Sequence, residues 1–551
     1  MMSSLFAICI SFYITLVLVP PLRRIARRIS LVDQPDERKI HVAAIPRVRG
    51  VGIIAGALAT FSLWVWAVHY PFTPQLKGLL IGIIILSVTG ILDDFFNLHY
   101  KKKLFGQCLA VALTLFFTRD YIVYLGVWSD TGEMVLSPFA GVALTFVFIA
   151  GITNAINLSD GLDGLAGGLS IFIFTALAII SFLDGRMELL IACFAVIGAL
   201  LAFLRYNSFP ANVFMGDTGS LFLGFTAAVI SIALTQNKDS AIARMLPLLI
   251  LGLPVMDMVF VFFLRLSRGM SPFKPDRKHF HYQFMRIGFS HAYAVVWMYF
   301  LQSLLFLLSI NLRYSAEIWV LGAFTAIFGS VLLFFYIAWR FHLTFSGGPK
   351  KVAARLNFNA KPYYRWVKSL SFNYVYVMVP VGLLGFSFTA ENIDMSFTGA
   401  VALLSITSLI LVRINRSLFS YSVRLTLYIF CLVLMLYTQH ITLPIVHFSI
   451  QTVHHLFWAS IALAVVVYHL VTRFEALKDT TLDYIILYMV LGVVLFPSEL
   501  IARWHLMTVT GGMLVFLWGS HLIWNTKKNP WNLLNASGLA GTVVILVRGL
   551  S

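Results

Sequence analysis

The stretch that decides the fold is GLLIGIIILSVTGILDDFFNL, residues 78–98. Its uncharged, apolar part, residues 78–92, is typical of a helix that crosses a bilayer. It ends in two adjacent carboxylates, Asp93 and Asp94, in a chain of which only 11% is charged. Paired acids at the end of such a segment need an explanation, either as a solvated helix end or as chemistry.

The composition indicates a membrane protein. The 551-residue chain is 60% hydrophobic with a mean hydropathy of +0.88, whereas soluble domains are about 45–50% apolar. Many apolar runs have the length of a membrane-spanning helix, and they lack the alternating pattern of a β-barrel strand. The first run is followed by basic residues and has no small-residue cleavage site, so we expect a retained helix rather than a signal peptide.

The charge and the cysteines exclude other classes. The net charge is +17, and basic loops beside membrane helices account for such an excess without any nucleic-acid partner. Four cysteines lie in or beside apolar runs without paired spacing. Neither a disulfide framework nor a zinc site is predicted.

The apolar runs predict an all-α polytopic fold with about 11 transmembrane helices in a core and about 7 in a C-terminal extension. The core spans are predicted at 3–21, 50–68, 77–93, 104–118, 137–156, 164–183, 188–204, 218–235, 245–264, 292–312 and 317–339. The later spans are predicted at 372–389, 396–412, 425–437, 455–472, 481–497, 506–524 and 533–548.

Basic residues assign the sides of the membrane. If the N-terminus is outside, the loop carrying RRIARR (23–28) is inside, and strict alternation assigns every later loop. Inside loops then hold 32 of the 40 Lys and Arg residues, as the positive-inside rule expects. Composition also predicts three parts: a membrane domain at 1–340, a basic cytoplasmic linker at 341–371 and a multi-span extension at 372–551.

Five polar segments fall on the predicted inside although they are far apart in the chain. They are DQPDERKIHVAAIPRVRG (33–50), LDDFF (92–96), NAINLSDGLDGLAGG (154–168), NVFMGDTGS (212–220) and SPFKPDRKHFHYQF (271–284). Each alone is explained as a solvated end, with Ser159 or Asp163 as a helix N-cap and the glycines allowing close packing. Together they place acids beside basic residues, as a magnesium-diphosphate substrate requires. A P-loop is not predicted, because the GxxxxGK[ST] pattern is absent.

These motifs, in this order over about residues 1–340, resemble the polyprenyl-phosphate N-acetylhexosamine-1-phosphate transferase superfamily. The similarity is greatest to bacterial undecaprenyl-phosphate GlcNAc-1-phosphate transferases and weaker to phospho-MurNAc-pentapeptide translocases. It implies that residues 1–340 form a transferase domain. It also implies transfer of a sugar 1-phosphate from a UDP-sugar to undecaprenyl phosphate, with release of UMP, at the start of cell-surface polysaccharide synthesis such as that of O-antigen.

The resemblance also implies roles for residues. Asp217 corresponds to a ligand of Mg²⁺, for which Mn²⁺ is a conceivable substitute, and Asp93 and Asp94 correspond to a catalytic pair. Whether Asp93 acts as a base, an orienting group or a metal ligand stays open, because a lipid phosphate is already largely a dianion at pH 7. The residues expected to bind the substrate are Lys39, His41, Asn157, Asp160, Asp163, Phe214, Arg277, His279 and His281.

Three features depart from the family pattern, and Tyr282 is the one that bears on the choice of sugar. Asn97 stands where a third acid is common, Tyr282 ends the histidine loop in place of histidine, and IPRVRG (45–50) replaces the sequence of the MurNAc-pentapeptide branch. The sugar therefore stays open between GlcNAc and a 6-deoxy relative such as QuiNAc or FucNAc. Asp257, inside a span, is interpreted first as a structural hydrogen-bond partner.

Other functions remain alternatives. A lipid-linked sugar transporter or flippase would place its acids near the bilayer midplane rather than at span ends. The extension could instead recruit polysaccharide-assembly proteins, and a homodimer is a further hypothesis. The expected location is the bacterial inner membrane, with the active site on the cytoplasmic face.

Overall fold

The computed structural model describes residues 2–28, 32–33, 45–46, 50–129, 132–271, 278–344, 362–389, 481–492 and isolated positions between 427 and 540. The chain divides into two compact units. The core unit is Ala7–Ser346, and the C-terminal unit is Gly347–Ser551 together with Met1–Phe6.

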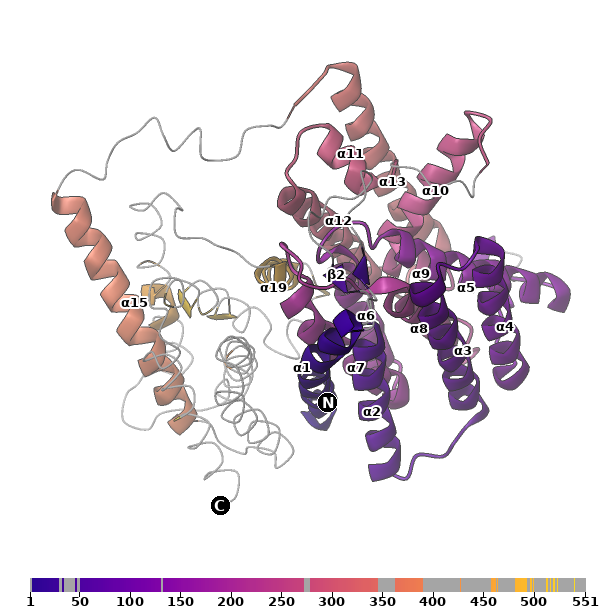
Figure 1. The fold of residues 1–551 in the computed structure, drawn as a ribbon, viewed down its shortest axis with the longest axis horizontal. Coiled ribbons are helices and arrows are strands. Elements are labelled where there is room, and N and C mark those ends of the chain that lie inside the picture. The colour runs from indigo at the N-terminus through magenta and orange to yellow at the C-terminus, as the bar shows by residue number, and fades with distance from the viewer. Residues whose placement is uncertain are drawn as a thin grey trace. The chain divides into compact units, whose positions relative to one another are not determined.

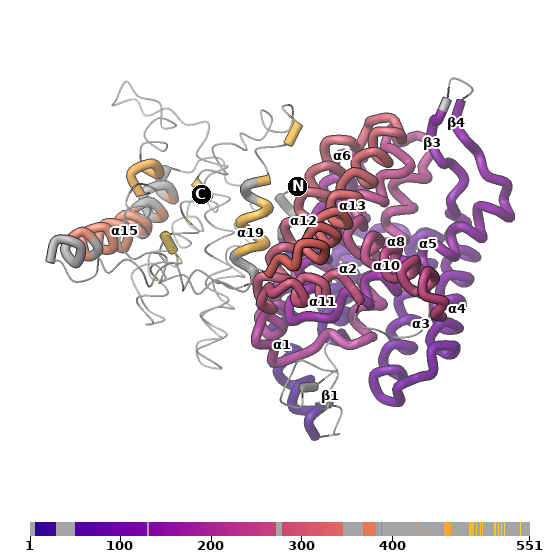
Figure 2. The backbone as a smooth tube through the Cα atoms, turned by 90° about the horizontal axis from the view of Figure 1, so that it is seen from above, coloured from indigo at the N-terminus to yellow at the C-terminus, as the bar shows by residue number. Residues whose placement is uncertain are grey.

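In its described residues, the core unit is a bundle of helices with two short antiparallel ladders (Figures 1 and 2). Its helices are α1 (Met2–Arg28), α2 (Gly50–Ala67), α3 (Pro74–Phe96), α4 (Tyr100–Thr118), α5 (Pro138–Leu158), α6 (Leu165–Leu183), α7 (Met187–Asn207), α8 (Gly216–Thr235), α9 (Pro247–Ile250), α10 (Gly252–Leu266), α11 (Phe280–Arg286), α12 (His291–Asn311) and α13 (Glu317–Arg340). Strands β1 (Val32–Asp33) and β2 (Ile45–Pro46) form one ladder. Strands β3 (Tyr124–Ser129) and β4 (Gly132–Val135) form the other, a hairpin that projects from the body of the unit in Figure 2.

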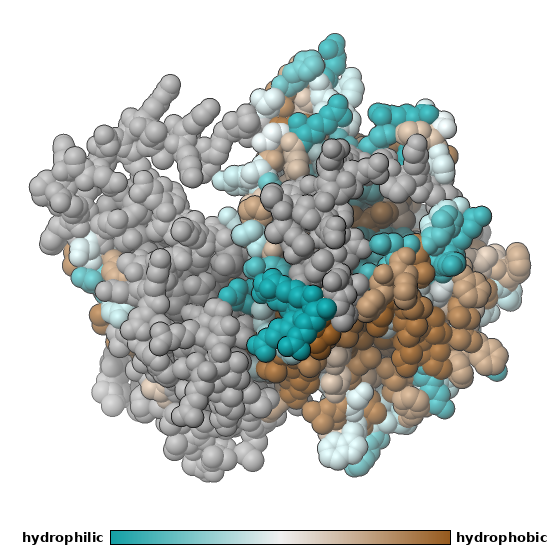
Figure 3. All heavy atoms as spheres, in the orientation of Figure 1, coloured by the Kyte–Doolittle hydropathy of each residue, from teal (hydrophilic) through white to brown (hydrophobic). Residues whose placement is uncertain are grey.

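The predicted fold class is confirmed. In the described part of the chain, nine helices are long and apolar enough to cross a membrane. On the face drawn in Figure 3, apolar side chains form a band over the region of α2 and α3, with hydrophilic residues above and below it. The chain is therefore a multi-pass α-helical membrane protein.

All eleven predicted core spans coincide with helical segments, but two of them are not among the nine candidates. The span predicted at 104–118 lies in α4, which carries lysines at 101–103 in its first turn. The span predicted at 245–264 is broken into α9 and the 15-residue α10. Gln302 bridges the break, since its Oε1 accepts from Leu253 N at 3.3 Å and its Nε2 donates to the Ile250 carbonyl at 3.0 Å. The predicted total of spans stays a prediction.

Helix packing brings particular helix ends together. Helix α3 packs against α4 and α8, α5 packs against α8, and α6 packs against α7. Close packing depends on glycine where backbones approach: a Cβ on Gly90 would lie 2.5 Å from Thr218 Cα. Helices α6, α7 and α8 are the most enclosed of the nine candidate spans, and α13 is the least.

The ends of α3 and α8 have distinct local causes. Thr73 caps α3 by accepting from Leu76 N, and Pro74 follows at the first helical position. At the other end Asn97 adopts a left-handed conformation with φ 45°, and its N–H donates to the Asp93 carbonyl at 2.8 Å. Asparagine tolerates this conformation better than most residues, which gives Asn97 a structural reason to replace the common acid. Helix α8 begins at Gly216, with φ 70°, and has no side-chain cap of its own.

The C-terminal unit contains α15 (Pro362–Thr389) and α19 (Thr481–Gly492). The Tyr374 hydroxyl donates to Ser460 Oγ at 2.8 Å, and Trp458 meets the edge of Phe516 with ring centroids 6.4 Å apart. Most residues of the later predicted spans lie outside the described residues. The assignment of 341–371 as a linker and 372–551 as a multi-span extension stays a prediction.

Candidate functional site

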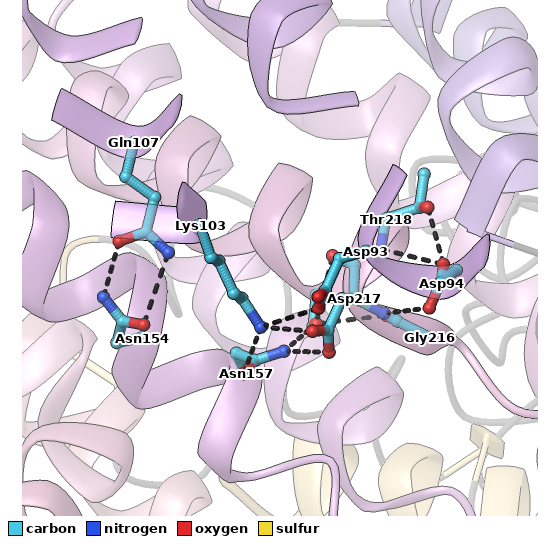
Figure 4. Close-up of polar contacts among 10 residues, drawn as sticks. Asp93, Asp94, Lys103, Gln107, Asn154, Asn157, Gly216, Asp217 and Thr218 are labelled. Carbon is cyan, nitrogen blue, oxygen red and sulfur yellow. Dashed lines mark hydrogen bonds and ion pairs between the residues drawn. The ribbon is translucent and has the colours of Figure 1, made fainter. Parts of the chain in front are cut away.

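The ends of four helices meet at a polar cluster (Figure 4). Helix α3 contributes Asp93 and α8 contributes Asp217. Helix α4 contributes Lys103 from its first turn, and α5 contributes Asn157 from its last turn. Three of these residues, Asp93, Asn157 and Asp217, were predicted from separate motifs, and the fold brings them together. We call Asp93, Lys103, Asn157 and Asp217 the acid cluster.

Lys103 lies at the centre of the acid cluster. Its Nζ donates to Asp217 Oδ2 in a short ion pair and lies 3.4 Å from Asp93 Oδ2. It also donates to Asn157 Oδ1 at 3.4 Å. One ammonium therefore faces two carboxylates, which offsets part of the repulsion between them.

Amide groups complete the cluster. Asn157 Nδ2 donates to Asp217 Oδ1 at 2.8 Å and to Ser220 Oγ at 2.7 Å. One turn earlier on α5, Asn154 pairs with Gln107 of α4 through hydrogen bonds of 2.7 and 3.3 Å. These bonds fix the ends of α4, α5 and α8 relative to one another.

Asp94 points away from Lys103. Its Oδ1 accepts from Asp217 N at 3.0 Å. Its Oδ2 accepts from Thr218 N at 3.3 Å and from Thr218 Oγ1 at 2.7 Å. Both oxygens of the buried carboxylate therefore bind the first turn of α8, which favours an anion because its N–H groups lack partners within the helix.

The segment after α5 places two more predicted acids. Asp163 Oδ2 accepts from Ala211 N at 2.8 Å, so this oxygen holds the chain that leads into α8. The carboxylate of Asp160 has no hydrogen-bond or ion-pair partner among the described residues. Burial, followed by the nearby charges of Asp217, Asp163 and Asp94, raises the pKa of Asp160 to about 7. Negative charge on Asp160 is therefore opposed by its surroundings.

Phe214 is half-buried two residues before the start of α8, in the segment next to Asp217. Three predicted binding residues cannot be placed: Lys39, His41 and Arg277 lie outside the described residues.

The two predicted histidines form a second assembly, which we call the histidine pair: His279 and His281. Their rings stack with centroids 5.8 Å apart and an interplanar angle of 4°. His279 Nδ1 lies 2.9 Å from Asp257 Oδ2, and Phe280 N donates to Asp257 Oδ1 at 2.6 Å. Asp257 is thus the structural hydrogen-bond partner expected from the sequence, and it also caps α11.

His281 is enclosed and neutral. It is 1% exposed, and neither ring nitrogen has a hydrogen-bond partner among the described residues. Burial lowers the pKa of His281 to about 4. A Cβ on Gly161 would lie only 2.3 Å from His281 Nε2, so the absence of a side chain at Gly161 makes room for the ring. Gly161 thereby links the histidine pair to the segment that carries Asp160 and Asp163.

Sequence reasoning missed Lys103, which was counted only among the basic residues of an inside loop. A signal was present. Lysine in the first turn of a helix opposes the helix dipole, and the lysines at 101–103 open α4. Such a placement indicates that a nearby anion compensates the charge.

The arrangement has the character of a site for a hard cation. Among the described residues, no group of three or more His, Cys, Asp or Glu side chains is arranged to hold a metal ion. Mg²⁺ is usually bound by one or two carboxylates, with phosphates and water as the other ligands. The ammonium of Lys103 already lies between the carboxylates of Asp217 and Asp93, so a cation fits between these two acids.

Comparison with known proteins agrees with this class of membrane protein. Residues 76–235 match the family described as Glycosyl transferase family 4. The undecaprenyl-phosphate alpha-N-acetylglucosaminyl 1-phosphate transferase of Escherichia coli (strain K12) is 38% identical over 297 residues, which are 53% of this chain and 79% of that protein. A probable undecaprenyl-phosphate N-acetylglucosaminyl 1-phosphate transferase of Bacillus subtilis (strain 168) is 36% identical over 318 residues, 57% of this chain and 86% of that protein.

The fold and the site define a class of protein: a polytopic helical membrane protein with a cluster of acids at its helix ends. Within that class, the chain belongs to glycosyl transferase family 4, in the polyprenyl-phosphate N-acetylhexosamine-1-phosphate transferase superfamily. The predicted family resemblance is confirmed. The matches to these two relatives cover 53% and 57% of this chain.

Proposed function

We propose that this protein transfers N-acetylhexosamine 1-phosphate, with GlcNAc 1-phosphate as the first candidate, from a UDP-sugar to undecaprenyl phosphate. An oxygen of the lipid phosphate attacks the β-phosphorus of the UDP-sugar. The bond from that phosphorus to the bridging oxygen breaks, and UMP leaves with the electron pair. The product is an undecaprenyl-diphosphate sugar, the starting lipid for a cell-surface polysaccharide.

The observation that carries this proposal is the acid cluster at the meeting point of α3, α4, α5 and α8. Phosphoryl transfer depends mainly on positioning and on neutralising the charge of the phosphates. Asp217 and Asp93 would hold Mg²⁺, which supplies that neutralisation when bound. Lys103 can turn from its carboxylate partners to a phosphate oxygen, because a lysine ammonium is a compact charge on a flexible stem.

The remaining residues are assigned by position. Asn157 orients the carboxylate of Asp217 through its 2.8 Å hydrogen bond. Phe214 is proposed to stack on uracil, and the histidine pair is proposed to lie at the diphosphate and the sugar. Asp93 is proposed to orient or deprotonate the lipid phosphate, and Lys39, His41 and Arg277 to add positive charge around the nucleotide sugar.

A flippase or transporter is the second candidate, but no described feature favours it. Coupling acids of transporters lie near the bilayer midplane on broken helices, whereas Asp93 and Asp217 occupy the ends of α3 and α8. The distribution of basic loops supports an inner-membrane protein with this cluster on the cytoplasmic side, where UDP-sugars are made.

The direct test uses the full-length protein purified in detergent with undecaprenyl phosphate and Mg²⁺. A panel of UDP-GlcNAc, UDP-QuiNAc, UDP-FucNAc and UDP-MurNAc-pentapeptide is scored for release of UMP. We expect turnover that requires both the lipid and Mg²⁺, with one N-acetylhexosamine preferred. If none of the four UDP-sugars yields UMP, the proposal is contradicted. Turnover restricted to UDP-MurNAc-pentapeptide would assign the protein to the translocase branch.

For the C-terminal unit we propose a role in binding partners or lipid rather than in transfer. All matched motifs end before residue 285, within the core unit Ala7–Ser346. A chain ending at Lys361 should therefore transfer sugar phosphate within about tenfold of the full chain, a barrier change of about 1.4 kcal/mol. Loss of the C-terminal unit should reduce polysaccharide assembly in cells by more than it reduces sugar-phosphate transfer. A truncated protein that is monodisperse yet releases no UMP contradicts this division.

A further inference from the structure

The two adjacent acids of α3 contact different partners. Asp93 faces Lys103, with 3.4 Å between Oδ2 and Nζ. Among the described residues, every hydrogen-bond partner of the Asp94 carboxylate belongs instead to the first turn of α8. The cause is helix geometry, since consecutive residues are rotated by about 100° around the axis. One acid therefore turns toward the cluster and the other toward the neighbouring helix.

Helix α8 needs this outside partner. The residue before it is Met215, whose side chain cannot cap, and Gly216 enters the helix with φ 70°. The free N–H groups of a first turn must find acceptors. Asp94 provides them for Asp217 and Thr218 from a different helix.

The same contact is reinforced by backbone packing. The N–H of Gly50 donates to the Met215 carbonyl at 3.0 Å. A Cβ on Gly50 would lie 2.1 Å from Gly219 N, and one on Gly90 would lie 2.5 Å from Thr218 Cα. Helices α2, α3 and α8 thus touch backbone to backbone at this point. The start of α8 has little freedom while these contacts and the bonds to Asp94 persist.

We propose that Asp94 is a positioning residue, which holds the first turn of α8 so that the Asp217 carboxylate faces Lys103, Asn157 and Asp93. Asp217 is the connecting residue, because its N–H binds Asp94 while its side chain belongs to the acid cluster. This inference rests on the proposed function, since it assigns Asp94 a part in that site. It also revises the expectation from the sequence that both acids of the pair are catalytic.

The test uses Asp94→Asn, Asp94→Ala, Thr218→Val and Thr218→Ser in the full-length protein. Thr218→Val removes the hydroxyl that donates to Asp94, and Thr218→Ser keeps it as the matched control. The first readout is hydrogen–deuterium exchange of the peptide covering residues 214–222. We expect about tenfold faster exchange in Asp94→Ala, a smaller rise in Thr218→Val and no change in Thr218→Ser.

The second readout separates positioning from a merely structural role. In Asp94→Asn and Thr218→Val, kcat should fall and the Mg²⁺ concentration for half-maximal activity should rise, while KM for the lipid stays within about twofold. Binding of UDP-GlcNAc with Mg²⁺, measured by calorimetry without the lipid, should weaken in parallel. The two substitutions share one contact, so their effects on exchange should not add.

Two results overturn the proposal. One is a large loss of kcat in Asp94→Asn with unchanged exchange and donor binding, which would place Asp94 in the chemistry itself. The other is additive behaviour of Asp94→Asn and Thr218→Val. A wild-type protein that releases no UMP from any donor, yet shows the expected exchange pattern, would reject the proposed function and leave the contact between Asp94 and α8 intact.

Discussion

The acid cluster and the histidine pair satisfy their polar groups in opposite ways. In the acid cluster the carboxylates of Asp93 and Asp217 share the Lys103 ammonium, and an amide supports them. In the histidine pair one ring is held by Asp257, while both ring nitrogens of the enclosed His281 lack partners in the part of the chain that the structure describes. Buried polar groups without partners are costly and uncommon.

The difference suggests different contributions. The acid cluster keeps its charges paired and partly accessible, which suits exchange of one cation for another when a substrate arrives. The histidine pair contributes packing by an uncharged His281 ring, because burial lowers the pKa of His281 to about 4. Substitutions in the acid cluster should therefore act on turnover, whereas those in the histidine pair should act on packing and stability as well.

The largest effect is expected for Asp217→Asn. The substitution removes the charge that pairs with Lys103 but keeps the backbone N–H that binds Asp94, so the protein should still fold. Loss of one preorganised electrostatic group costs about 10²–10³-fold in turnover, and we expect the upper end, measured as UMP release. Asp239→Asn, which changes an exposed acid, is the matched control. Near-normal turnover of Asp217→Asn at limiting Mg²⁺ would contradict the metal assignment.

The next effect, about 10²-fold, is expected for Asp93→Asn and for Lys103→Met, the low end for positioned proton-transfer groups. Lys103→Arg keeps the positive charge and serves as its control. If Asp93 deprotonates the lipid phosphate, raising the pH should partly restore Asp93→Asn. A deficit that is constant with pH would assign Asp93 to orientation or metal binding, and full activity of Lys103→Met would remove the lysine from the mechanism.

A fall in turnover of about tenfold is expected for Gly161→Ala. This substitution tests the contact between the histidine pair and the segment that carries Asp160 and Asp163. The added Cβ would lie 2.3 Å from His281 Nε2 and 2.5 Å from Cε1, so the ring must move. Gly151→Ala is the control, because its nearest neighbour, Met258 Cε, is 3.7 Å away. Turnover and thermal stability are measured for both. Equal results for the two variants would show that the histidine pair adapts without cost.

Much of the fold was predictable, because membrane helices can be identified in a sequence by their length and apolar composition. All eleven core spans coincide with helices, and the motifs of α3, α5 and α8 do meet. The break between α9 and α10 was not predictable, because it depends on Gln302, a residue far along the chain that satisfies the interrupted backbone.

Sequence motifs predicted three of the four members of the acid cluster, Asp93, Asn157 and Asp217, but neither Lys103 nor the direction in which each side chain points. LDD does not reveal which carboxylate faces the cluster, because that depends on how α3 is rotated against α8. Nor does a run of three lysines at 101–103 reveal that the last one reaches two acids from other motifs. Hydrogen-bond partners follow from tertiary packing, which one sequence does not encode in any local pattern.

The smallest effect on transfer is expected when the neutral state of His281 is probed. A pKa of about 4 in the folded protein, below the ordinary value of about 6.5, means that the unfolded chain binds a proton first as the pH falls. The stability that comes from neutral burial is therefore complete above about pH 6.5 and is lost as the pH falls toward 4. At pH 5 the loss is at most about 2 kcal/mol, at 1.36 kcal/mol per pKa unit.

His281→Gln cannot titrate, so its stability deficit relative to wild type should shrink by up to that amount between pH 7 and pH 5. Unfolding in SDS, followed at both values, measures the difference. The pH profile of kcat should keep its shape in the variant, because a neutral ring contributes no ionisation between pH 5 and pH 8. A deficit that is the same at both pH values would mean that His281 titrates alike in the folded and unfolded chain, and would end the contrast between a charged cluster and a neutral pair.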